Sequence, residues 1–421
     1  MSIKSIQLNI LFRILLLLGV VCIVFLTFMS LRWTFGKTIA KQADVKEIAE
    51  YSTQLAPNEP QTYFALAVFN EKSLLQEDLK KAVENYEKAV SVSPNDFRLW
   101  LALGKARERS GDSQGAEKAL RKSLELAPNY SEIHWSLGNY LLRQGKEEEA
   151  FAEISKAVTQ DIKYANPAVI LAWQVYDGDL NQIAQKVGDS VAIKAQLAPF
   201  LVKQKRFDEA FNFWNAIPDE EKKTTYKKNG EEFFTQLVEA KSFRNALTVQ
   251  SQIAKPEDEK FAIGTLFNPD FEQNVKPANA SVFDWKIGEG IQPQVSLDAS
   301  QKNAGIRSLI MLYNSSDGKE MRNIQQAVAV ESGKNYKIEG FYRSDLKTLG
   351  VVKLEILDAT DNKVLASADA QANSKDWSPL SVSFTTPAAS QGILIRLGNA
   401  VCKQALCPVS GKIWFDNFSL K

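Results

Sequence analysis

Few of the residues that build familiar catalytic and metal sites are present in this sequence. His134 is the one histidine, and the cysteines are Cys22, Cys402 and Cys407. Zinc sites combine three or four Cys, His or carboxylate ligands, and a Ser-His-Asp triad needs a histidine held beside its nucleophile. A single histidine leaves little material for either, so the sequence argues against zinc and triad chemistry.

Other enzyme signatures are equally sparse. Gly288-Glu-Gly290 is a lone Gly-x-Gly, and Pro293 stands where a phosphate-binding loop would have its third glycine. Carboxylates are numerous, but a glycosidase needs two at a defined separation in a cleft, and no two stand out. With 51 basic and 50 acidic residues the chain has no net field for nucleic acid. We therefore expect a protein that is not an enzyme, has no catalytic cofactor and binds no nucleic acid.

The sharper chemical signal is the pair Cys402 and Cys407, which enclose Lys-Gln-Ala-Leu in a predicted loop. A disulfide would fix this loop, and the loop-entropy relation gives about 2 kcal/mol for so short a ring. Disulfides persist in oxidising compartments, so the bond would place this part of the chain outside the cytoplasm. Cys22 lies in an apolar segment, out of reach. The alternative is that Cys402 and Cys407 are free thiols.

An uncharged apolar run from Ile14 to Leu31 stands near the amino terminus. As a helix with about 1.5 Å per residue it reaches roughly 27 Å, close to the hydrocarbon thickness of a bilayer. We expect an uncleaved single-pass anchor, with Trp33 at the interface. A cleaved signal peptide is the alternative, with Thr38-Ile-Ala40 as a poor cleavage site.

The charges flanking this run leave its orientation open, because basic residues stand on both sides. A disulfide between Cys402 and Cys407 would decide the matter. The amino terminus would then lie in the cytoplasm and the bulk of the chain in the periplasm, on a bacterial inner membrane.

Three alanines, Ala82, Ala116 and Ala150, recur at intervals of 34 residues. Around them stand Trp100, Leu103-Gly104, Gly111, Leu120 and Pro128, then His134, Leu137-Gly138, Gly145 and Ile154. This period and pattern resemble the tetratricopeptide repeat (TPR), a pair of helices with small residues at their close approach. The sequence departs from the family at Arg107 and Leu141, which often are Tyr, and at Ile162, which often is Pro. His134 takes the seam position of Trp100, so we expect a core or edge histidine.

The resemblance implies that the units stack into a superhelix whose first helices face a concave groove. The groove positions are Arg98, Leu101, Lys105 and Arg109 in one unit, and Trp135, Asn139, Leu142 and Arg143 in the next. Cations and an amide beside an aromatic ring suit an acidic or carboxylate-ended segment of a protein partner. A merely solvated face is the alternative interpretation.

The repeat pattern weakens beyond Lys163 but continues. Leu197-Ala198, Ala210 and Trp214 repeat the seam residues, and Phe233 and Ala246 do so again. We interpret residues 166–253 as degenerate helical pairs. The predicted organisation is 1–33 for a cytoplasmic tip and membrane anchor, 34–262 for the TPR-like array, and 263–421 for a further domain.

Alternating apolar and polar residues replace the helical pattern from Phe267 onward. Nine segments are predicted strands: 292–297, 308–313, 324–330, 336–343, 351–358, 363–368, 377–385, 393–397 and 412–420. Short strands separated by turn signals predict an all-β sandwich.

Three motifs mark this strand-rich region. They are Asn268-Pro-Asp-Phe271-Glu272 with Phe283-Asp-Trp285, then Asp376-Trp377 with Phe384-Thr-Thr-Pro387, then Ile413-Trp414-Phe-Asp416-Asn-Phe418. They resemble carbohydrate-binding modules of the galactose-binding-like group. The resemblance implies a jelly-roll sandwich in which Glu272 and Asp416 hold a structural Ca²⁺, a cation that takes 6–8 oxygens. Ordinary strand-end carboxylates are the alternative to the calcium site. We expect Trp285, Trp377 and Trp414 to be core residues, and stacking on sugar rings is the alternative for them.

The fold class is therefore multidomain: an all-α TPR-like superhelix followed by an all-β jelly-roll sandwich, preceded by one transmembrane helix. Such a chain suggests a membrane-anchored scaffold that recruits a protein and contacts a polysaccharide, in exopolysaccharide or envelope assembly. An assembly factor with only protein-binding modules and a glycan-active enzyme are the alternatives.

Overall fold

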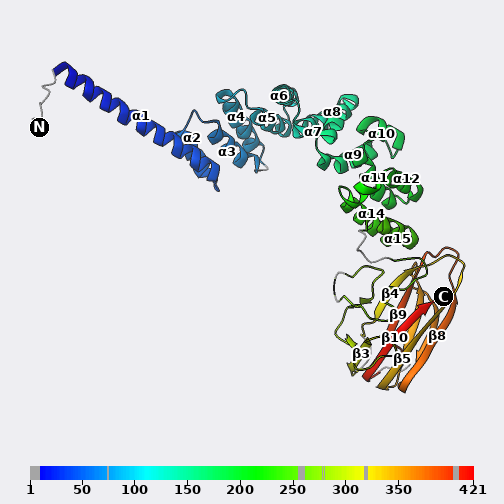
Figure 1. Cartoon of the computed structure of the whole chain (residues 1–421). Coiled ribbons are helices and arrows are strands. Elements are labelled where there is room, and N and C mark those ends of the chain that lie inside the picture. Colours follow the sequence, from blue (N-terminus) through cyan, green and yellow to red (C-terminus); the bar gives the residue numbers. More distant parts are fainter. Residues whose placement is uncertain are drawn as a thin grey trace, which may run out of the picture. The chain divides into compact units, whose positions relative to one another are not determined.

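The computed structural model describes residues 10–73, 75–254, 261–276, 278, 280–316, 321–401 and 407–421. Its contacts divide the chain into two units, Met1–Ile193 and Lys194–Lys421. Figure 1 shows helices through α15, followed by strands to the carboxyl terminus. The predicted fold class, helices and then two β-sheets with one apolar amino-terminal helix, is confirmed.

The first unit is a succession of helices joined by short turns. They are α1 (Ile10–Gln42), α2 (Lys46–Leu55), α3 (Pro60–Glu71), α4 (Gln76–Val92), α5 (Phe97–Ser110), α6 (Ser113–Leu126), α7 (Ser131–Arg143), α8 (Glu147–Gln160), the 3₁₀ turn η1 (Ile162–Tyr164), α9 (Ala165–Val175) and α10 (Leu180–Val187). The pairs α3 with α4, α5 with α6 and α7 with α8 pack against each other, as the repeat pattern predicts.

The small residues of the pattern lie where two helices of a pair approach most closely. A Cβ atom on Gly104 would stand 2.7 Å from Leu120 Cγ, and one on Gly138 would stand 2.7 Å from Ile154 Cγ1. Gly111 ends α5 with φ of 90°, a conformation that glycine adopts without strain. Asp112 then caps α6, because its carboxylate accepts a hydrogen bond from the amide of Gly115 at 2.9 Å.

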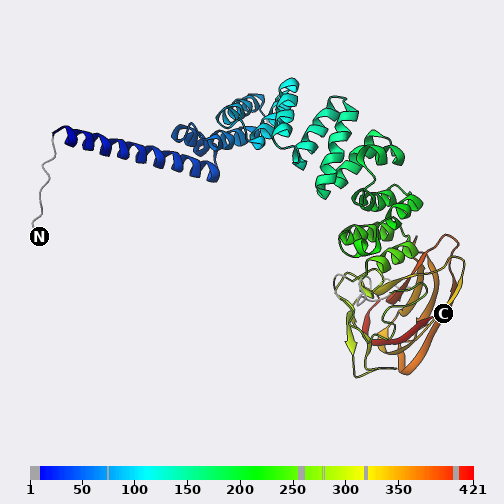
Figure 2. The same cartoon turned by 45° about the horizontal axis from the view of Figure 1, so that its top comes forward.

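Helix α1 has two different parts. Its span from Phe12 is long and apolar enough to cross a membrane, and none of the residues in its most apolar part is buried. Beyond Leu31 the same helix continues and packs on α2 and α3, with Ala40 buried beside Ala49 and Ala65. Figure 2 shows the blue amino-terminal part of α1 running on beyond α2 and α3. The predicted boundary at 33/34 thus falls inside one unbroken helix.

The boundary between the units falls within α11 (Val191–Lys203), and the second unit continues with α12 (Phe207–Asn215), α13 (Asp219–Lys223), α14 (Lys227–Glu239) and α15 (Phe243–Ile253). The seam residues predicted from the weakened repeat are buried in them, namely Leu197, Ala198, Ala210, Trp214, Phe233 and Ala246. The prediction that this region is helical is therefore confirmed, and its division into degenerate repeats stays a prediction.

The strands form two antiparallel sheets packed on one core. One sheet has the order β1-β4-β9-β6-β7 and the other the order β2-β3-β10-β5-β8. Their bounds are β1 (Lys286–Ile287), β2 (Gln294–Asp298), β3 (Ser308–Ser315), β4 (Ile324–Ala329), β5 (Asn335–Thr348), β6 (Val351–Asp358), β7 (Val364–Ala370), β8 (Asn373–Thr385), β9 (Gly392–Val401) and β10 (Val409–Leu420). Each of the nine predicted strands has a counterpart here, while the two-residue β1 was not predicted.

Aromatic rings from the ends of the strand-rich region fill one part of the sandwich core. Phe271, Trp285, Phe415 and Phe418 are at most 3% exposed and lie in ring contact. Trp285 Nε1 donates to the carbonyl of Asn268 at 3.0 Å, so its one polar atom is satisfied. The prediction that Trp285 is a core residue is confirmed.

Helix α15 packs directly on the sandwich. A Cβ on Gly392 of β9 would stand 2.5 Å from Phe243 Cδ2, and Phe283 lies in edge contact with Phe243. Ser242 Oγ donates to the side chain of Gln391 at 3.2 Å. Because of these contacts the last helices and the sandwich belong to one unit, and the predicted boundary at 262/263 remains a prediction based on sequence.

Candidate partner-binding site

An open pocket of about 730 Å³ lies on helices α5 and α7. It is lined by Lys105, Glu108, Arg109, Ser113, Trp135, Ser136, Asn139, Arg143 and Gln144. Five of the eight predicted groove residues are in this set: Lys105, Arg109, Trp135, Asn139 and Arg143. The first helices of two successive repeats therefore bring these side chains together, as the repeat geometry implies.

The cations of the pocket are held by glutamates. Lys105 Nζ stands 2.7 Å from Glu132 Oε1. Arg109 Nη1 donates to Glu71 Oε1 and Arg143 Nε donates to Glu108 Oε1, each at 2.7 Å. The two arginine pairs repeat one relation, since in each a glutamate near the end of a first helix meets an arginine of the next first helix.

This pairing makes the pocket nearly neutral rather than basic. The side chains of Arg109 and Arg143 are nevertheless 56% exposed. A guanidinium carries five N–H donors, so one glutamate leaves further donors directed at solvent. Sequence reasoning found the cations but missed Glu71 and Glu108, whose role depends on the stacking of neighbouring repeats.

The remaining predicted groove residues do not line the pocket. Leu101 is 6% exposed and packs in the core between the repeats. Leu142 packs against the same core. Arg98 donates to both carboxylate oxygens of Asp96, at 2.9 and 2.7 Å, and this hydrogen bonding lowers the pKa of Asp96. Leu101 is therefore unavailable to a ligand, and Arg98 is occupied at the start of α5.

His134 is buried and serves the repeat rather than a reaction. Its Nε2 lies 2.8 Å from the carbonyl of Pro128, and its Nδ1 lies 2.5 Å from Glu153 Oε2. Trp100, the same position of the preceding repeat, donates its Nε1–H to the carbonyl of Pro94 at 2.7 Å. The two rings thus tie the start of their helix to the proline turn before it, which confirms the structural interpretation of His134.

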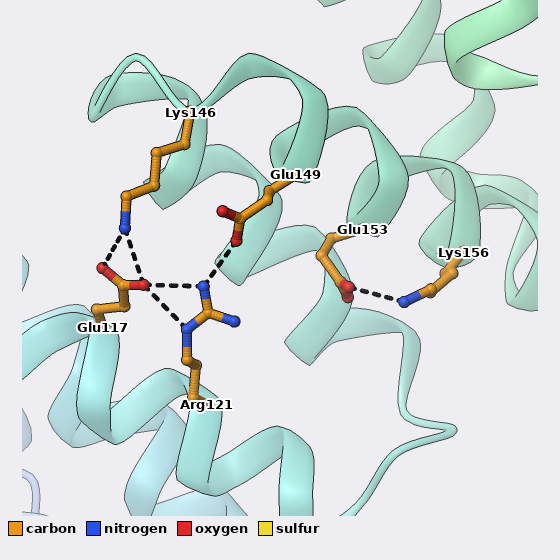
Figure 3. Close-up of polar contacts among 6 residues, drawn as sticks. All are labelled: Glu117, Arg121, Lys146, Glu149, Glu153 and Lys156. Carbon is orange, nitrogen blue, oxygen red and sulfur yellow. Dashed lines mark hydrogen bonds and ion pairs between the residues drawn. The ribbon is translucent and has the colours of Figure 1, made fainter.

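Ion pairs also link the second helices of neighbouring repeats (Figure 3). Lys146 Nζ stands 2.8 Å from Glu117 Oε2, and Arg121 meets both Glu117 and Glu149, at 2.9 and 2.8 Å. Hydrogen bonds from Lys146 and then Arg121 lower the pKa of Glu117 despite its partial burial. The sequence pattern did not indicate this network, because its charges come from two repeats.

In the sandwich, Glu272 and Asp416 hold the same loop. Glu272 Oε1 accepts from the amide of Ile306 at 2.7 Å. Asp416 Oδ2 accepts from the amides of Asn303 and Ala304 at 2.7 and 3.0 Å, and Oδ1 accepts from that of Asn417. Burial raises the pKa of Asp416, against these hydrogen bonds, and the negative charge of Glu272 raises it further.

These contacts bear on the calcium hypothesis. Both oxygens of Asp416 face N–H donors, whereas Ca²⁺ needs 6–8 oxygen ligands. Within the part of the chain that the structure describes, no group of three or more His, Cys, Asp or Glu could hold a metal ion. The residues present do not by themselves make a calcium cage, and a structural Ca²⁺ stays a prediction.

The tryptophans of the strand-rich region occupy different environments. Trp414 alternates along β10 with the core residues Ile413 and Phe415, so it lies on the outer face of its sheet. It is 8% exposed, donates to Asp298 Oδ2 at 2.8 Å, and stands under the guanidinium of Arg343. Trp377 on β8 is half-buried.

The cysteine pair is untested. Cys402 lies outside the described residues, whereas Cys407 is 3% exposed and packs in the sandwich core. The exposed Cys22 is a free thiol on α1. The disulfide between Cys402 and Cys407 therefore stays a prediction.

Comparisons with known proteins agree on the repeats. Family models described as "Tetratricopeptide repeat" and "TPR repeat" match residues 101–165 and 74–111. The peroxisomal targeting signal receptor of Saccharomyces cerevisiae (strain ATCC 204508 / S288c) is 25% identical over 105 residues, which are 25% of this chain and 17% of the receptor. The chain thus spans about a sixth of that relative's length, and the TPR interpretation of residues 74–165 is confirmed.

Two solved structures show weaker likenesses. A crystal structure of MamA is 17% identical with a TM-score of 0.30, covering 40% of this chain and 86% of that chain. A CBM4 structure is 16% identical with a TM-score of 0.29, covering 37% of this chain and 98% of that chain. At TM-scores of this size neither adds to the description of fold or function.

Proposed function

We propose that this protein is a non-enzymatic scaffold, anchored in a bacterial inner membrane by α1, with its bulk in the periplasm. Its repeats recruit a protein partner and its sandwich contacts a polysaccharide during exopolysaccharide or envelope assembly. The observation that carries the proposal is the α5–α7 pocket, in which residues of two confirmed TPR repeats converge. TPR arrays present extended surfaces for other chains, and one relative is itself a targeting signal receptor.

The chemistry of the pocket favours an acidic or carboxylate-ended segment. Arg109 and Arg143 each use part of their guanidinium on a glutamate and expose the rest. Trp135, stacked on Tyr164 with ring centroids 5.1 Å apart, offers a fixed aromatic surface beside them. A ligand carboxylate would bind by charge-assisted hydrogen bonds, which are stronger than neutral ones.

Two matched triple variants test this site. Lys105→Ala, Arg109→Ala and Arg143→Ala together should abolish binding of short acidic peptides with a free carboxyl end. Glu132→Gln, Glu71→Gln and Glu108→Gln remove the paired glutamates and should strengthen the same binding, because the cations are then released. Circular dichroism checks that both variants keep their helices. Equal binding of acidic and neutral, amidated peptides by the wild type would overturn the proposal.

We assign the proposed sugar contact to the outer face of the sheet β2-β3-β10-β5-β8. The half-buried Phe341 and Trp377 supply aromatic surface there, and Arg343, which covers the buried Trp414, supplies hydrogen-bond donors. Binding of the full chain to an array of bacterial polysaccharides should fall when Trp377 or Phe341 becomes Ala, while Lys363→Ala, an exposed lysine just before β7 in the other sheet, serves as control. Binding of proteins alone would support the assembly-factor alternative, and turnover of a bound glycan would support an enzyme.

The uncleaved anchor is supported by the packing of α1. Helices α1 and α2 pack as a hairpin in which Gly36 approaches α2 closely, since an added Cβ would stand 2.8 Å from Ala56 Cβ, and in which Ala40 is buried. Cleavage after Ala40 would remove both residues and with them this packing. A reporter active only outside the cytoplasm, fused after Lys421, should work and should stay in the membrane fraction. Activity of a cytoplasmic reporter at that position would contradict the orientation.

A further inference from the structure

A groove of about 640 Å³ lies between α1 and α2. It is lined by Phe28, Leu31, Arg32, Phe35, Tyr51, Gln54 and Leu55. Four of these side chains are strongly exposed, with 59% for Phe28, 66% for Leu31, 57% for Phe35 and 53% for Tyr51. Large apolar side chains gathered on one surface mark an interaction site rather than ordinary solvent exposure.

The groove is continuous with the apolar surface of α1. Phe28 and Leu31 belong to the apolar run itself, whereas Tyr51 and Leu55 come from α2, which returns along α1. The hairpin is closed by the approach of Gly36 to Leu55 and Ala56. If α1 crosses a bilayer, Phe28 and Leu31 lie in the hydrocarbon, and the wall formed by α2 lies toward the interface, where Tyr and Trp are favoured.

Arg32 gives the groove a charged centre. Its Nη2 donates to the carbonyl of Gln54 at 2.6 Å, which holds the guanidinium between the two helices. Among the described residues no carboxylate forms an ion pair with it. The remaining N–H donors suit a phosphate oxygen, since the planar guanidinium fork matches phosphate geometry. A phospholipid whose acyl chain lies beside Phe28 and Leu31 would have its phosphate at the level of Arg32.

We propose that the groove holds a phospholipid of the bilayer, with its acyl chain against Phe28 and Leu31 and its phosphate on Arg32. The proposal rests on the anchor in the proposed function and goes beyond it. Helix α2 becomes part of the membrane contact, so the repeats are held at the bilayer by a packed hairpin instead of a loose tether. The unbroken run of α1 to Gln42 gives that hairpin its rigidity.

Photocrosslinking from the full chain in phospholipid vesicles tests the groove. The photoreactive analogue p-benzoylphenylalanine replaces Tyr51 in the groove, Val24 in the middle of the apolar run, or Tyr130 in the turn before α7. Tyr130 is a matched control because it is also a tyrosine and is 42% exposed. We expect labelled phospholipid to be captured from positions 51 and 24 and not from position 130.

The outcomes separate this inference from the anchor. Capture at position 24 without capture at position 51 overturns the lipid groove and leaves the anchor standing. Capture at neither position overturns both. A crosslinked protein dimer from position 51, in place of a lipid adduct, would show that a second copy of the chain fills the groove and would also overturn the inference.

The role of Arg32 is tested in the same vesicles. Arg32→Gln should lower lipid capture from position 51 about tenfold, the change expected when one charge-assisted hydrogen bond is lost. Arg32→Lys keeps the charge but not the planar fork, so its capture should lie between those of Arg32→Gln and the wild type. Capture from position 24 should be the same in both variants, which reports that α1 is still inserted. Equal capture from position 51 in the wild type and both variants would show that Arg32 does not bind the lipid phosphate.

Discussion

The repeats α5–α8 and the β-sandwich are held together by contacts between residues at very different separations in the sequence. In the repeats, Gly104 meets Leu120 and Gly138 meets Ile154, so the decisive contact lies within one helix pair and recurs in the next. In the sandwich, Asp416 accepts from an amide 113 positions earlier, and Trp414 donates to a carboxylate 116 positions earlier. A repeated local contact can be recognised from spacing, whereas a single long-range contact leaves no such signal.

A smaller comparison within the repeats refines this point. Trp100 and His134 occupy the same position of successive repeats. In both, a ring nitrogen contacts the carbonyl oxygen of the proline that precedes the helix. His134 then adds a contact to Glu153 that Trp100 has no means to make. Spacing therefore determines where a side chain lies, and the residue type determines which further partner it takes.

The largest effect is expected from filling the close approach in a repeat. Gly138→Leu should lower the free energy of unfolding by about 3 kcal/mol, because overpacking has that cost and the backbone carbonyl of Ala150 stands only 2.9 Å from the added Cβ. Gly104→Leu should act alike if the two repeats are equivalent. Thermal unfolding followed by circular dichroism measures both.

Gly19→Leu is the control for these variants, since no atom lies within 4 Å of a Cβ at Gly19. An unchanged melting temperature for Gly138→Leu would show that Gly138 does not lie where the two helices of its repeat approach most closely.

A smaller loss is expected from removing the long-range acceptor of the sandwich. Asp416→Ala leaves the amides of Asn303, Ala304 and Asn417 without their acceptor, which should cost about 2 kcal/mol. Hydrogen exchange at Asn303 and Ala304 should accelerate more than exchange in the β3–β10 ladder. Uniform acceleration across the sandwich would show that Asp416 supports the whole fold rather than this loop.

The predicted disulfide should have an effect of similar or smaller size. Cys402→Ser breaks the bond and leaves the buried Cys407 in the core, and the loop-entropy relation allows at most about 2 kcal/mol for so short a ring. Mass spectrometry of exported protein, alkylated before reduction, would detect the bond directly. Recovery of both thiols in alkylated form would exclude it and with it the argument for an oxidising compartment.

The smallest effect is expected on the pH dependence of stability, through protonation of Glu153 in acid. Burial alone would raise the pKa of Glu153, but hydrogen bonds from Lys156 and His134 lower it below its usual value. A carboxylate with a lowered pKa stabilises the fold above its unfolded pKa of about 4.3, and this contribution is lost as the pH falls through the folded pKa.

Glu153→Gln tests this contribution. The variant should be less stable than the wild type by about 1 kcal/mol at pH 7, and the two should converge as the pH falls through the lowered pKa of Glu153 in the folded protein. Lys156→Ala removes one of the two hydrogen bonds and should show an intermediate difference. A difference that stays constant with pH would mean that the charge of Glu153 contributes nothing.

The sequence by itself determined the order of the elements in this protein. The spacing of Ala82, Ala116 and Ala150 located the helix pairs, and alternation located nine strands, because both patterns record which face of an element is buried. The two-residue β1 was missed because it is too short to show alternation. Five pocket residues were found because the repeat assigns each position a face.

The tertiary structure alone decided which of those residues are available. It placed Leu101 in the core, gave the pocket cations their glutamates from neighbouring helices, and brought Asp416 to the loop at Asn303. It also joined the apolar run and the first packed helix into one element, α1, and set α2 beside it. These facts depend on the stacking of elements distant in the chain, and the free energy of such contacts is not recorded in the spacing of either partner.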